Sequence, residues 1–201
     1  MTAVPKAKLT VAEYLAIERR AEFKSEFYDG EMFAMAGASR EHNTVNENLS
    51  VRIGGQLLGG PCRTYSRDLR VRIERTGLYC YPDLVIVCGE PRMAEEDKDT
   101  LTNPRVVVEV LSPSTERYDR TTKFRHYKQL PSVEEYVLVA QDEAWCERYS
   151  RQADGSWAHV EFVGLDATLE LKSVPVAVPL ADVYAGVTFP PPEPPPAGVM
   201  R

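Results

Sequence analysis

The sequence lacks any apolar run close to the ~20 residues that a membrane-spanning helix needs. Its first ten residues, MTAVPKAKLT, also lack the apolar core of a secretory signal. These two absences argue against a membrane protein and against an exported one. We therefore expect a cytoplasmic protein without a membrane partner.

The four cysteines form no Cys-x-x-Cys pair, and no histidine stands near them at zinc-finger spacing. This absence argues against a zinc finger. We interpret Cys62, Cys80, Cys88 and Cys146 as small buried thiols in a reducing compartment.

The chain also lacks an excess of positive charge, since its formal net charge is −6. This argues against a protein that coats nucleic acid without specificity, although the cations that are present are clustered. No internal repeat is visible, and 201 residues favour a single domain. We expect that domain over residues 1–189, followed by a disordered tail at 190–201 that opens with PPPEPPP.

One apolar run stands out, because a single carboxylate interrupts it. Residues 106–111 read VVVEVL, which is typical of a strand buried on both faces, and Glu109 lies inside it. A buried charge is costly unless it is paired or bound to a metal. The strand ends at Ser112-Pro113-Ser114, and a helix rich in cations is expected from Thr115 to Leu130.

A second carboxylate, Asp83, lies at the mouth of another buried strand, because Pro82 fits only the entry of a strand. If Asp83 and Glu109 converge, their oxygens, with the carbonyl of Val110 as a third ligand, suit Mg²⁺ or Mn²⁺. A water bound to such an ion is able to attack a phosphodiester. The alternative is that both acids are paired with arginines such as Arg105.

A cation is expected near these acids. Lys123 lies on the third turn of the basic helix, four residues after Asp119 and therefore on the same face. It would orient the attacking water or neutralise the phosphate, and the alternative is an ordinary helix pair. Glu26 is a further candidate acid, and His42 is a candidate for substrate binding or proton transfer.

Several other cations are candidates for phosphate binding, with solubility as the alternative. Strict alternation in residues 68–74 predicts a strand with Leu69, Val71 and Ile73 facing in and with Arg70 and Arg72 facing out. The basic helix contributes Arg117, Arg120, Arg125, His126 and Lys128.

The remaining pattern predicts further elements in chain order. These are a helix from Thr10 to about Arg20 with a Thr10–Glu13 capping box, two strands within 26–33 around Asp29-Gly30, and a helix with the stripe Val45, Leu49, Ile53 and Leu57. The strand after Asp83 is expected to pair with 68–74 as a hairpin, and 89–102 to be an exposed loop. A parallel strand at 135–139, a hairpin of 145–150 with 157–163 and a helical turn at 180–185 complete the pattern.

Three segments together resemble one family in order and spacing: SEFYDGEM at 25–32, YPDLVIV at 81–87, and RVVVEVLSPST followed by Asp119, Lys123, Tyr127 and EEYVLV. It is the Uma-type family of restriction-like endonucleases, within the PD-(D/E)XK nuclease superfamily, and the resemblance covers roughly Leu9 to Tyr184. It implies a mixed α/β (α+β) fold, in which helices flank a restriction-endonuclease-like mixed sheet, and a Mg²⁺-dependent site.

The resemblance assigns Asp83 and Glu109 as the two motif acids, while Glu26, Asp119 and, more loosely, His42 match recurring positions. The superfamily's lysine would stand two residues after the second acid, where this chain has Leu111, so the lysine function is expected on Lys123. Superfamily relatives often act as dimers, which implies a homodimer here.

The main hypothesis is a Mg²⁺-dependent DNA endonuclease. The departure at Leu111 and the acidic net charge keep a second one open, a nucleic-acid-binding or assembly module without turnover. A third is a metal-dependent hydrolase of small phosphodiesters.

Overall fold

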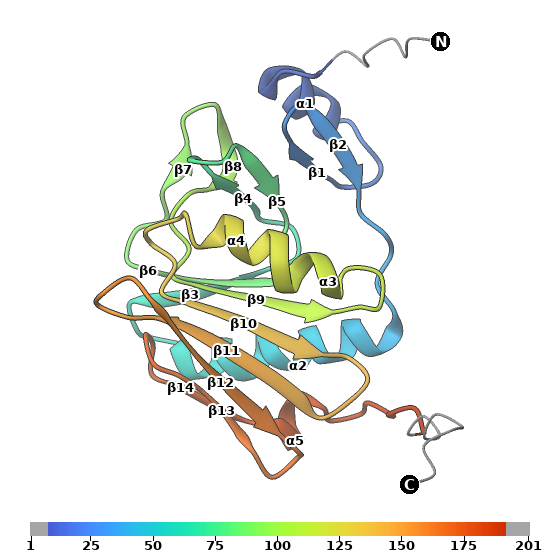
Figure 1. Cartoon of the computed structure of the whole chain (residues 1–201), viewed down its shortest axis with the longest axis vertical. Helices are drawn as coiled ribbons and strands as arrows, with labels where there is room; N and C mark the ends of the chain where they lie inside the picture. Colours follow the sequence, from blue (N-terminus) through green and yellow to red (C-terminus); the bar gives the residue numbers. More distant parts are fainter. Residues whose placement is uncertain (1–7, 192–201) are drawn as a thin grey trace, which may run out of the picture.

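A six-stranded mixed sheet forms the centre of the computed structural model, which describes residues 8–191 (Figure 1). Its strand order is β12-β11-β10-β9-β6-β3. The strands β9 and β10 run parallel, and each other neighbouring pair is antiparallel. The bounds are β3 Cys62–Ser66, β6 Leu84–Cys88, β9 Val106–Leu111, β10 Glu135–Ala140, β11 Trp145–Arg151 and β12 Trp157–Val163.

The predicted burial of β9 on both faces is confirmed, because all six of its residues are buried. Val106, Val108 and Val110 face a core built with α2. Val107 and Leu111 face a second core on the other side, built with Phe124 and Tyr127 of the helical segment between β9 and β10. Glu109 has the same parity as Val107, so the alternation of the strand places it on this second side.

Helices cover both faces of the central sheet (Figure 1). On one face lies α2, whose stripe of Val45, Leu49, Ile53 and Leu57 is buried as its four-residue spacing predicts. On the other lie α3, a π-helical turn (η1) and α4, which continue one another. The helices span α1 Val11–Glu18, α2 Arg40–Leu57, α3 Glu116–Tyr118, η1 Asp119–Lys123, α4 Phe124–Tyr127 and α5 Leu180–Val183.

A second six-stranded sheet has the order β2-β1-β5-β4-β8-β7. Its strands are β1 Ser25–Tyr28, β2 Glu31–Ala34, β4 Arg70–Ile73, β5 Leu78–Cys80, β7 Met93–Ala94 and β8 Asp97–Leu101. The predicted hairpin around Asp29-Gly30 is confirmed, with Asp29 at φ 48° and Gly30 at φ 80°. The predicted capping box of α1 is also present, and α1 packs its Tyr14 and Leu15 on Phe27 of this hairpin.

Two predictions about this second sheet are wrong. The hairpin partner of β4 is β5, not the strand that follows Asp83, because Thr76-Gly77 already turns the chain. Residues 89–102 are not a plain exposed loop, since they contain β7 and β8, and Asp97 is buried there. The acidic composition of residues 95–99 does not indicate a strand. Its one buried carboxylate, Asp97, is neutralised by ion pairs with distant arginines, which no local pattern reveals.

The cysteine interpretation is right for two residues and wrong for the other two. Cys80 and Cys146 are buried free thiols. Cys62 and Cys88 form a disulfide, because the antiparallel register of β3 and β6 sets them directly opposite each other.

The C-terminal part confirms the predicted hairpin of β11 and β12 and the helical turn at α5. A further hairpin of β13 Thr168–Leu171 and β14 Val176–Pro179 packs on the α2 side of the core. Residues 192–201 of the expected tail lie outside the described part of the chain. Within residues 8–191, no helix has both the length and the apolar character to cross a membrane. The predicted mixed α+β fold with helices flanking a mixed sheet is confirmed.

Candidate active site

Asp83 and Glu109 converge because two antiparallel strands carry them. The register of β6 and β9 pairs Leu84 with Val108, and one step further places Asp83 opposite Glu109 on the same face of the sheet. Asp83 is held there, since its Oδ2 accepts a hydrogen bond of 2.8 Å from the backbone N–H of Val110. The Val110 carbonyl as a metal ligand stays a prediction.

Lys123 lies among three carboxylates that come from three separate parts of the chain. Its Nζ is 2.9 Å from Glu109 Oε1, 3.2 Å from Glu26 Oε1 and 3.6 Å from Asp119 Oδ1. All four side chains are almost fully buried. The structure therefore brings together the predicted acids and the predicted cation. The alternative partner Arg105 pairs instead with Glu134, at 2.8 Å.

A π-helical turn presents Lys123 to these acids. The N–H of Phe124 bonds to the carbonyl of Asp119, five residues back, which widens the helix between α3 and α4. Such turns are rare and occur frequently at functional sites. Both charged ends of this turn, Asp119 and Lys123, point into the acid cluster, while the exposed positions of the same segment remain polar.

Burial and the crowding of like charges set the protonation of the cluster. Burial raises the pKa of Glu109 well above its ordinary value, and the nearby Asp119 and Asp83 raise it further, against the opposing effect of Lys123. Burial likewise raises the pKa of Asp119. Burial alone would lower the pKa of Lys123, but Glu109, Glu26 and Asp119 together outweigh it and raise the pKa. Lys123 is therefore a cation at neutral pH.

The donor set fits a divalent cation with oxygen ligands. Glu109, Glu26 and Asp119 surround one ammonium, and Asp83 lies opposite Glu109 in the strand register, so anionic charge exceeds cationic charge when all are ionised. Hard cations such as Mg²⁺ prefer carboxylate oxygens of this kind.

The cluster lies at a cavity of about 730 Å³ between the β1–β2 hairpin, the segment 33–39, the turn after β9 and the helix that carries Lys123. Its lining includes Glu26, Asp83, Glu109, Asp119, Lys123 and His42. His42 places Nε2 3.3 Å from Asp83 Oδ2. Ser39, the N-cap of α2, donates a hydrogen bond to Gln141 Oε1 just after β10, and this 3.1 Å contact joins two walls of the cavity.

Three side chains near the acids received no role from the sequence, although Tyr127 belongs to the motif that carries the resemblance: Tyr127 and Tyr118 contact acids, and Cys80 contacts Tyr127. Tyr127 donates a hydrogen bond of 3.3 Å to Glu109 Oε1, and its hydroxyl also lies 3.1 Å from Cys80 Sγ. Burial raises the pKa of Tyr118, and Glu26, which accepts its hydrogen bond, raises it further. Tyr127 follows Lys123 by four residues, so helical spacing was a signal for it. Cys80 and Tyr118 gave no such signal.

Three of the candidate phosphate-binding arginines, Arg70, Arg72 and Arg120, have carboxylate partners, whereas Arg117 and Arg125 are exposed and form no ion pair among residues 8–191. Arg70 does not face out as predicted: it is 5% exposed and pairs with Asp97, while its Nε and Nη1 donate to Thr100 and Tyr81. Arg72 pairs with Glu96 at 2.6 Å. Arg120 pairs with Glu116 at 2.7 Å and with Glu147. A phosphate contact by Arg72 or Arg120 stays a prediction.

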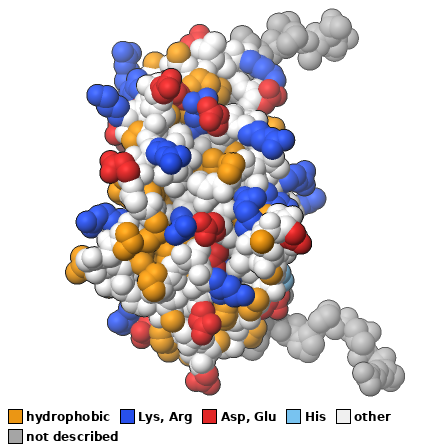
Figure 2. Space-filling model, turned by 90° about the vertical axis from the view of Figure 1, so that its left-hand side faces the viewer, with side chains coloured by type: hydrophobic (Ala, Val, Ile, Leu, Met, Phe, Trp, Pro, Cys, Tyr) orange, Lys and Arg blue, Asp and Glu red, His pale blue; other side chains and the backbone are white. Residues whose placement is uncertain are grey.

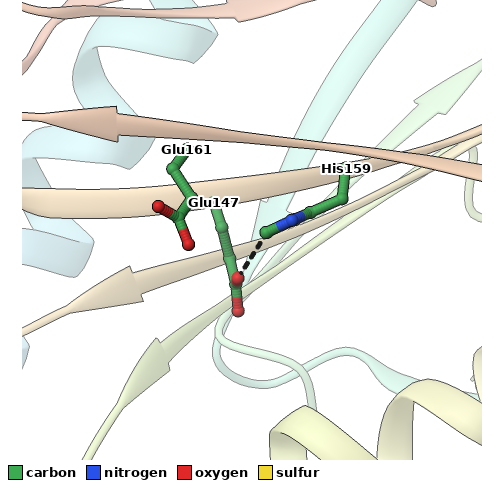
Figure 3. Close-up of side chains that lie close together, drawn as sticks. All are labelled: Glu147, His159 and Glu161. Atoms are coloured by element: carbon green, nitrogen blue, oxygen red, sulfur yellow. Dashed lines mark hydrogen bonds and ion pairs between the residues drawn. The ribbon is translucent and has the colours of Figure 1, made fainter.

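A second group with metal-ligand chemistry lies away from this cavity, on the neighbouring strands β11 and β12 (Figure 3). It consists of Glu147, His159 and Glu161, and His159 Nε2 is 2.7 Å from Glu147 Oε2. Glu147 is already neutralised by Arg120 and accepts a further bond from Tyr149. The carboxylate that is buried here therefore has an arginine partner, whereas those around Lys123 share one ammonium.

Three comparisons relate the chain to known proteins. The model of the Uma2 family, described as "Putative restriction endonuclease", matches residues 11–181. Two proteins of Synechocystis sp. are similar: "Uncharacterized protein slr1290" is 37% identical over 185 residues, which is 92% of this chain and 96% of the relative. "Uncharacterized protein sll1609" is 35% identical over 164 residues, which is 82% of this chain and 93% of the relative.

A crystal structure from Anabaena variabilis, described as "a putative nuclease belonging to DUF820", has a similar fold. Its TM-score is 0.71 at 18% identity, and the match covers 88% of this chain and 97% of that one. At this identity the likeness establishes the fold alone. The family model, in contrast, spans nearly all of the chain that surrounds the cavity, from α1 to α5, and the chain therefore belongs to the Uma2 family.

Proposed function

We propose that this protein is a Mg²⁺- or Mn²⁺-dependent endonuclease that hydrolyses phosphodiester bonds of DNA. One observation carries the proposal: Asp83, Glu109 and Lys123, far apart in sequence, meet in a single cavity with excess carboxylate. Membership of a family described as "Putative restriction endonuclease" supports the same reaction class.

Asp83 and Glu109 are the proposed metal ligands, because they come from adjacent strands and share one face of the sheet. The Val110 N–H fixes the orientation of Asp83, and His42 contacts the same oxygen. When bound, the metal ion supplies Lewis-acid stabilisation of the phosphate and lowers the pKa of a bound water. Tyr127 holds Glu109 from the side of the core.

Lys123 is proposed to neutralise the phosphate and to orient the attacking water. Its raised pKa keeps it protonated, which suits a donor and a cation and does not suit a general base. Leu111 occupies the position where the superfamily motif has its lysine, and it is buried in the core. Lys123 supplies the missing ammonium from the helix, 2.9 Å from Glu109.

Glu26 and Asp119 complete the surroundings of Lys123. Each lies within 4 Å of its ammonium and so holds Nζ beside Glu109. We propose Glu26 as the further acid of the site and Asp119 as a positioning residue for Lys123. His42 is proposed to contact substrate from the N-terminal turn of α2, where it lines the cavity.

The test is cleavage of plasmid DNA with Mg²⁺ or Mn²⁺ by wild type, Asp83→Asn, Glu109→Gln and Lys123→Met. Each variant is expected to lose roughly 100-fold or more in rate, since each removes a group that acts on the transition state. Glu161→Gln is the matched control, because it removes an acid of the second cluster. Equal cutting by wild type and all three site variants would reject the assignment.

The same protein preparations separate the alternatives. DNA binding without cleavage under any divalent ion would favour a binding or assembly module. Hydrolysis of a chromogenic diester without DNA affinity would favour a small-phosphodiester hydrolase. A homodimer, which cleavage of both strands would require, stays a prediction that sedimentation can test.

A further inference from the structure

The β1–β2 hairpin has two faces with different environments. Phe27 and Met32, which are directly paired, pack against α1 on one face. Glu26 and Phe33 are also directly paired, so both project from the other face, and Tyr28 follows on the same side. This second face delivers Glu26 to Lys123 and places Phe33 and Tyr28 at the cavity.

Three large apolar side chains at the cavity remain exposed. Phe33 is 49% exposed, Tyr28 39% and Met35 38%, and all three line the cavity beside the buried carboxylates. We call these three residues the apolar lip. Tyr118 lines the same cavity from the helix side. Exposed aromatic rings next to a charged site suit a ligand that carries a flat ring beside a phosphate.

Few cationic side chains beside this cavity are available to attract the phosphates of duplex DNA. Among the described residues that line it, Lys123 is the one Lys or Arg, and it is already paired with carboxylates. The chain as a whole has a net charge of −6. On the left-hand side of the view in Figure 1, away from the segment 33–39, Figure 2 shows cationic and anionic side chains interspersed without a continuous basic surface. Proteins that grip duplex DNA draw on several unpaired cations at phosphates.

The size of the cavity also favours a ligand narrower than duplex DNA. Its volume of about 730 Å³ is that of a site for a small ligand or a short stretch of nucleotides. The acids lie at almost fully buried positions inside it. A flexible single strand can follow the walls of a recessed site and place its phosphate beside the acids, which a stiff duplex does less readily.

We propose that the apolar lip stacks on an unpaired base next to the phosphate that is cut, so that the substrate class is single-stranded or locally unpaired nucleic acid. This inference rests on the proposed nuclease function. Phe33 is the central residue, because its partner in the hairpin register is Glu26, which contacts Lys123. Binding then depends on stacking more than on phosphate charge.

The first experiment compares three fluorescein-labelled substrates of one sequence: a single strand, a blunt duplex and a duplex with a single-stranded flap. With Mg²⁺ or Mn²⁺, wild type is expected to cut the single strand and the flap at least ~10-fold faster than the duplex. Phe33→Ala is expected to slow cutting of the single strand about 10-fold, the effect of losing one stacked base. Phe33→Trp should retain the rate, and Phe33→Leu should not.

The second experiment measures binding without chemistry. An oligothymidine strand is titrated by fluorescence anisotropy into Glu109→Gln, and into the same background with Phe33→Ala or Phe23→Ala. Phe23 is the matched control, because it is 72% exposed and does not line the cavity. Phe33→Ala is expected to weaken binding about 10-fold and Phe23→Ala to leave it unchanged.

The outcomes separate this inference from the proposed function. If wild type cuts the duplex as fast as the single strand and Phe33→Ala changes neither, the inference is overturned while the nuclease proposal stands. If wild type cuts none of the three substrates, the proposed function fails first. If Phe33→Ala changes the mass of the protein in sedimentation but not its binding of oligothymidine, the lip is a protein interface and the inference is overturned.

Discussion

Two buried ionic clusters in this protein contain similar groups but opposite charge balances. Around Asp97 in the second sheet, Arg70 and Arg19 both contact one carboxylate, and Thr100 donates a further hydrogen bond at 2.5 Å. Around Lys123, one ammonium serves three carboxylates. The first cluster satisfies its acid completely, and the second leaves anionic charge over.

The pKa of Asp97 and the pKa of Glu109 are shifted in opposite directions. Burial alone would raise the pKa of Asp97, but hydrogen bonds from Thr100, Arg19 and Arg70 outweigh it and lower the pKa to about 2. Burial raises the pKa of Glu109, and Lys123 does not compensate because it is shared. Burial of a carboxylate therefore does not by itself indicate a functional site. The balance between the carboxylate and its cationic and hydrogen-bonding partners is the more informative feature.

The largest effect on stability is expected when Asp97, the acid that two arginines neutralise, is removed. Asp97→Ala leaves Arg70 buried without its carboxylate, and loss of one partner of such a pair costs about 3–5 kcal/mol. Urea unfolding measures the loss. The control Asp99→Ala, on an exposed position of β8, should change the free energy of unfolding by less than about 0.5 kcal/mol. Similar losses in both variants would contradict the role assigned to Asp97.

Divalent cations should act on the unbalanced cluster alone. At a free Mg²⁺ or Mn²⁺ concentration of 100 times Kd, binding to the native state stabilises it by about 2.7 kcal/mol. We expect this increase in wild type and in Glu161→Gln, and its loss in Asp83→Asn and Glu109→Gln, measured by thermal unfolding with and without the metal. Loss in Glu161→Gln with retention in Glu109→Gln would move the metal site to β11–β12.

The free energy of unfolding should depend on pH with opposite signs for the two clusters. Asp97 has a folded pKa below its unfolded 3.8, so it contributes about 2 kcal/mol that is present above pH 3.8 and is lost as the pH falls through about 2. Glu109 has a raised folded pKa, so stability falls as the pH rises from about 4.5 through that value. Unfolding free energy against pH in Asp97→Asn and Glu109→Gln measures both slopes. A Glu109→Gln curve that stays parallel to that of wild type at every pH above about 4.5 would speak against the raised pKa.

The smallest effect on stability is expected at Glu109. Glu109→Gln removes one of the surplus charges, while Glu26 and Asp119 still pair with Lys123. In the absence of metal and near pH 4.5, where the native state keeps Glu109 protonated, its free energy of unfolding should stay within about 1 kcal/mol of wild type, although cleavage is lost. Urea unfolding tests this; a loss as large as that of Asp97→Ala would make Glu109 a structural residue.

The sequence was most informative for elements whose formation depends on residues close together in the chain. The capping box of α1, the Asp-Gly hairpin and the stripe of α2 required only neighbouring residues, and each was predicted. Alternation in β4 gave the correct grouping of Arg70 with Arg72, but it could not tell that α1 and Asp97 would cover the face on which Arg70 lies.

What the sequence by itself determined is a part of the strands and helices, among them α1, the β1–β2 hairpin, α2, β9 and β10, and the place of Asp83 and Glu109 at two buried strands, because apolar runs and proline act locally. Only the tertiary structure decided the charge balance. The meeting of Glu26 with Lys123, the neutralisation of Asp97 by Arg70 and Arg19, and the disulfide of Cys62 with Cys88 all depend on contacts between distant segments. Electrostatic energy depends on distances through space, and spacing along the chain does not fix those distances.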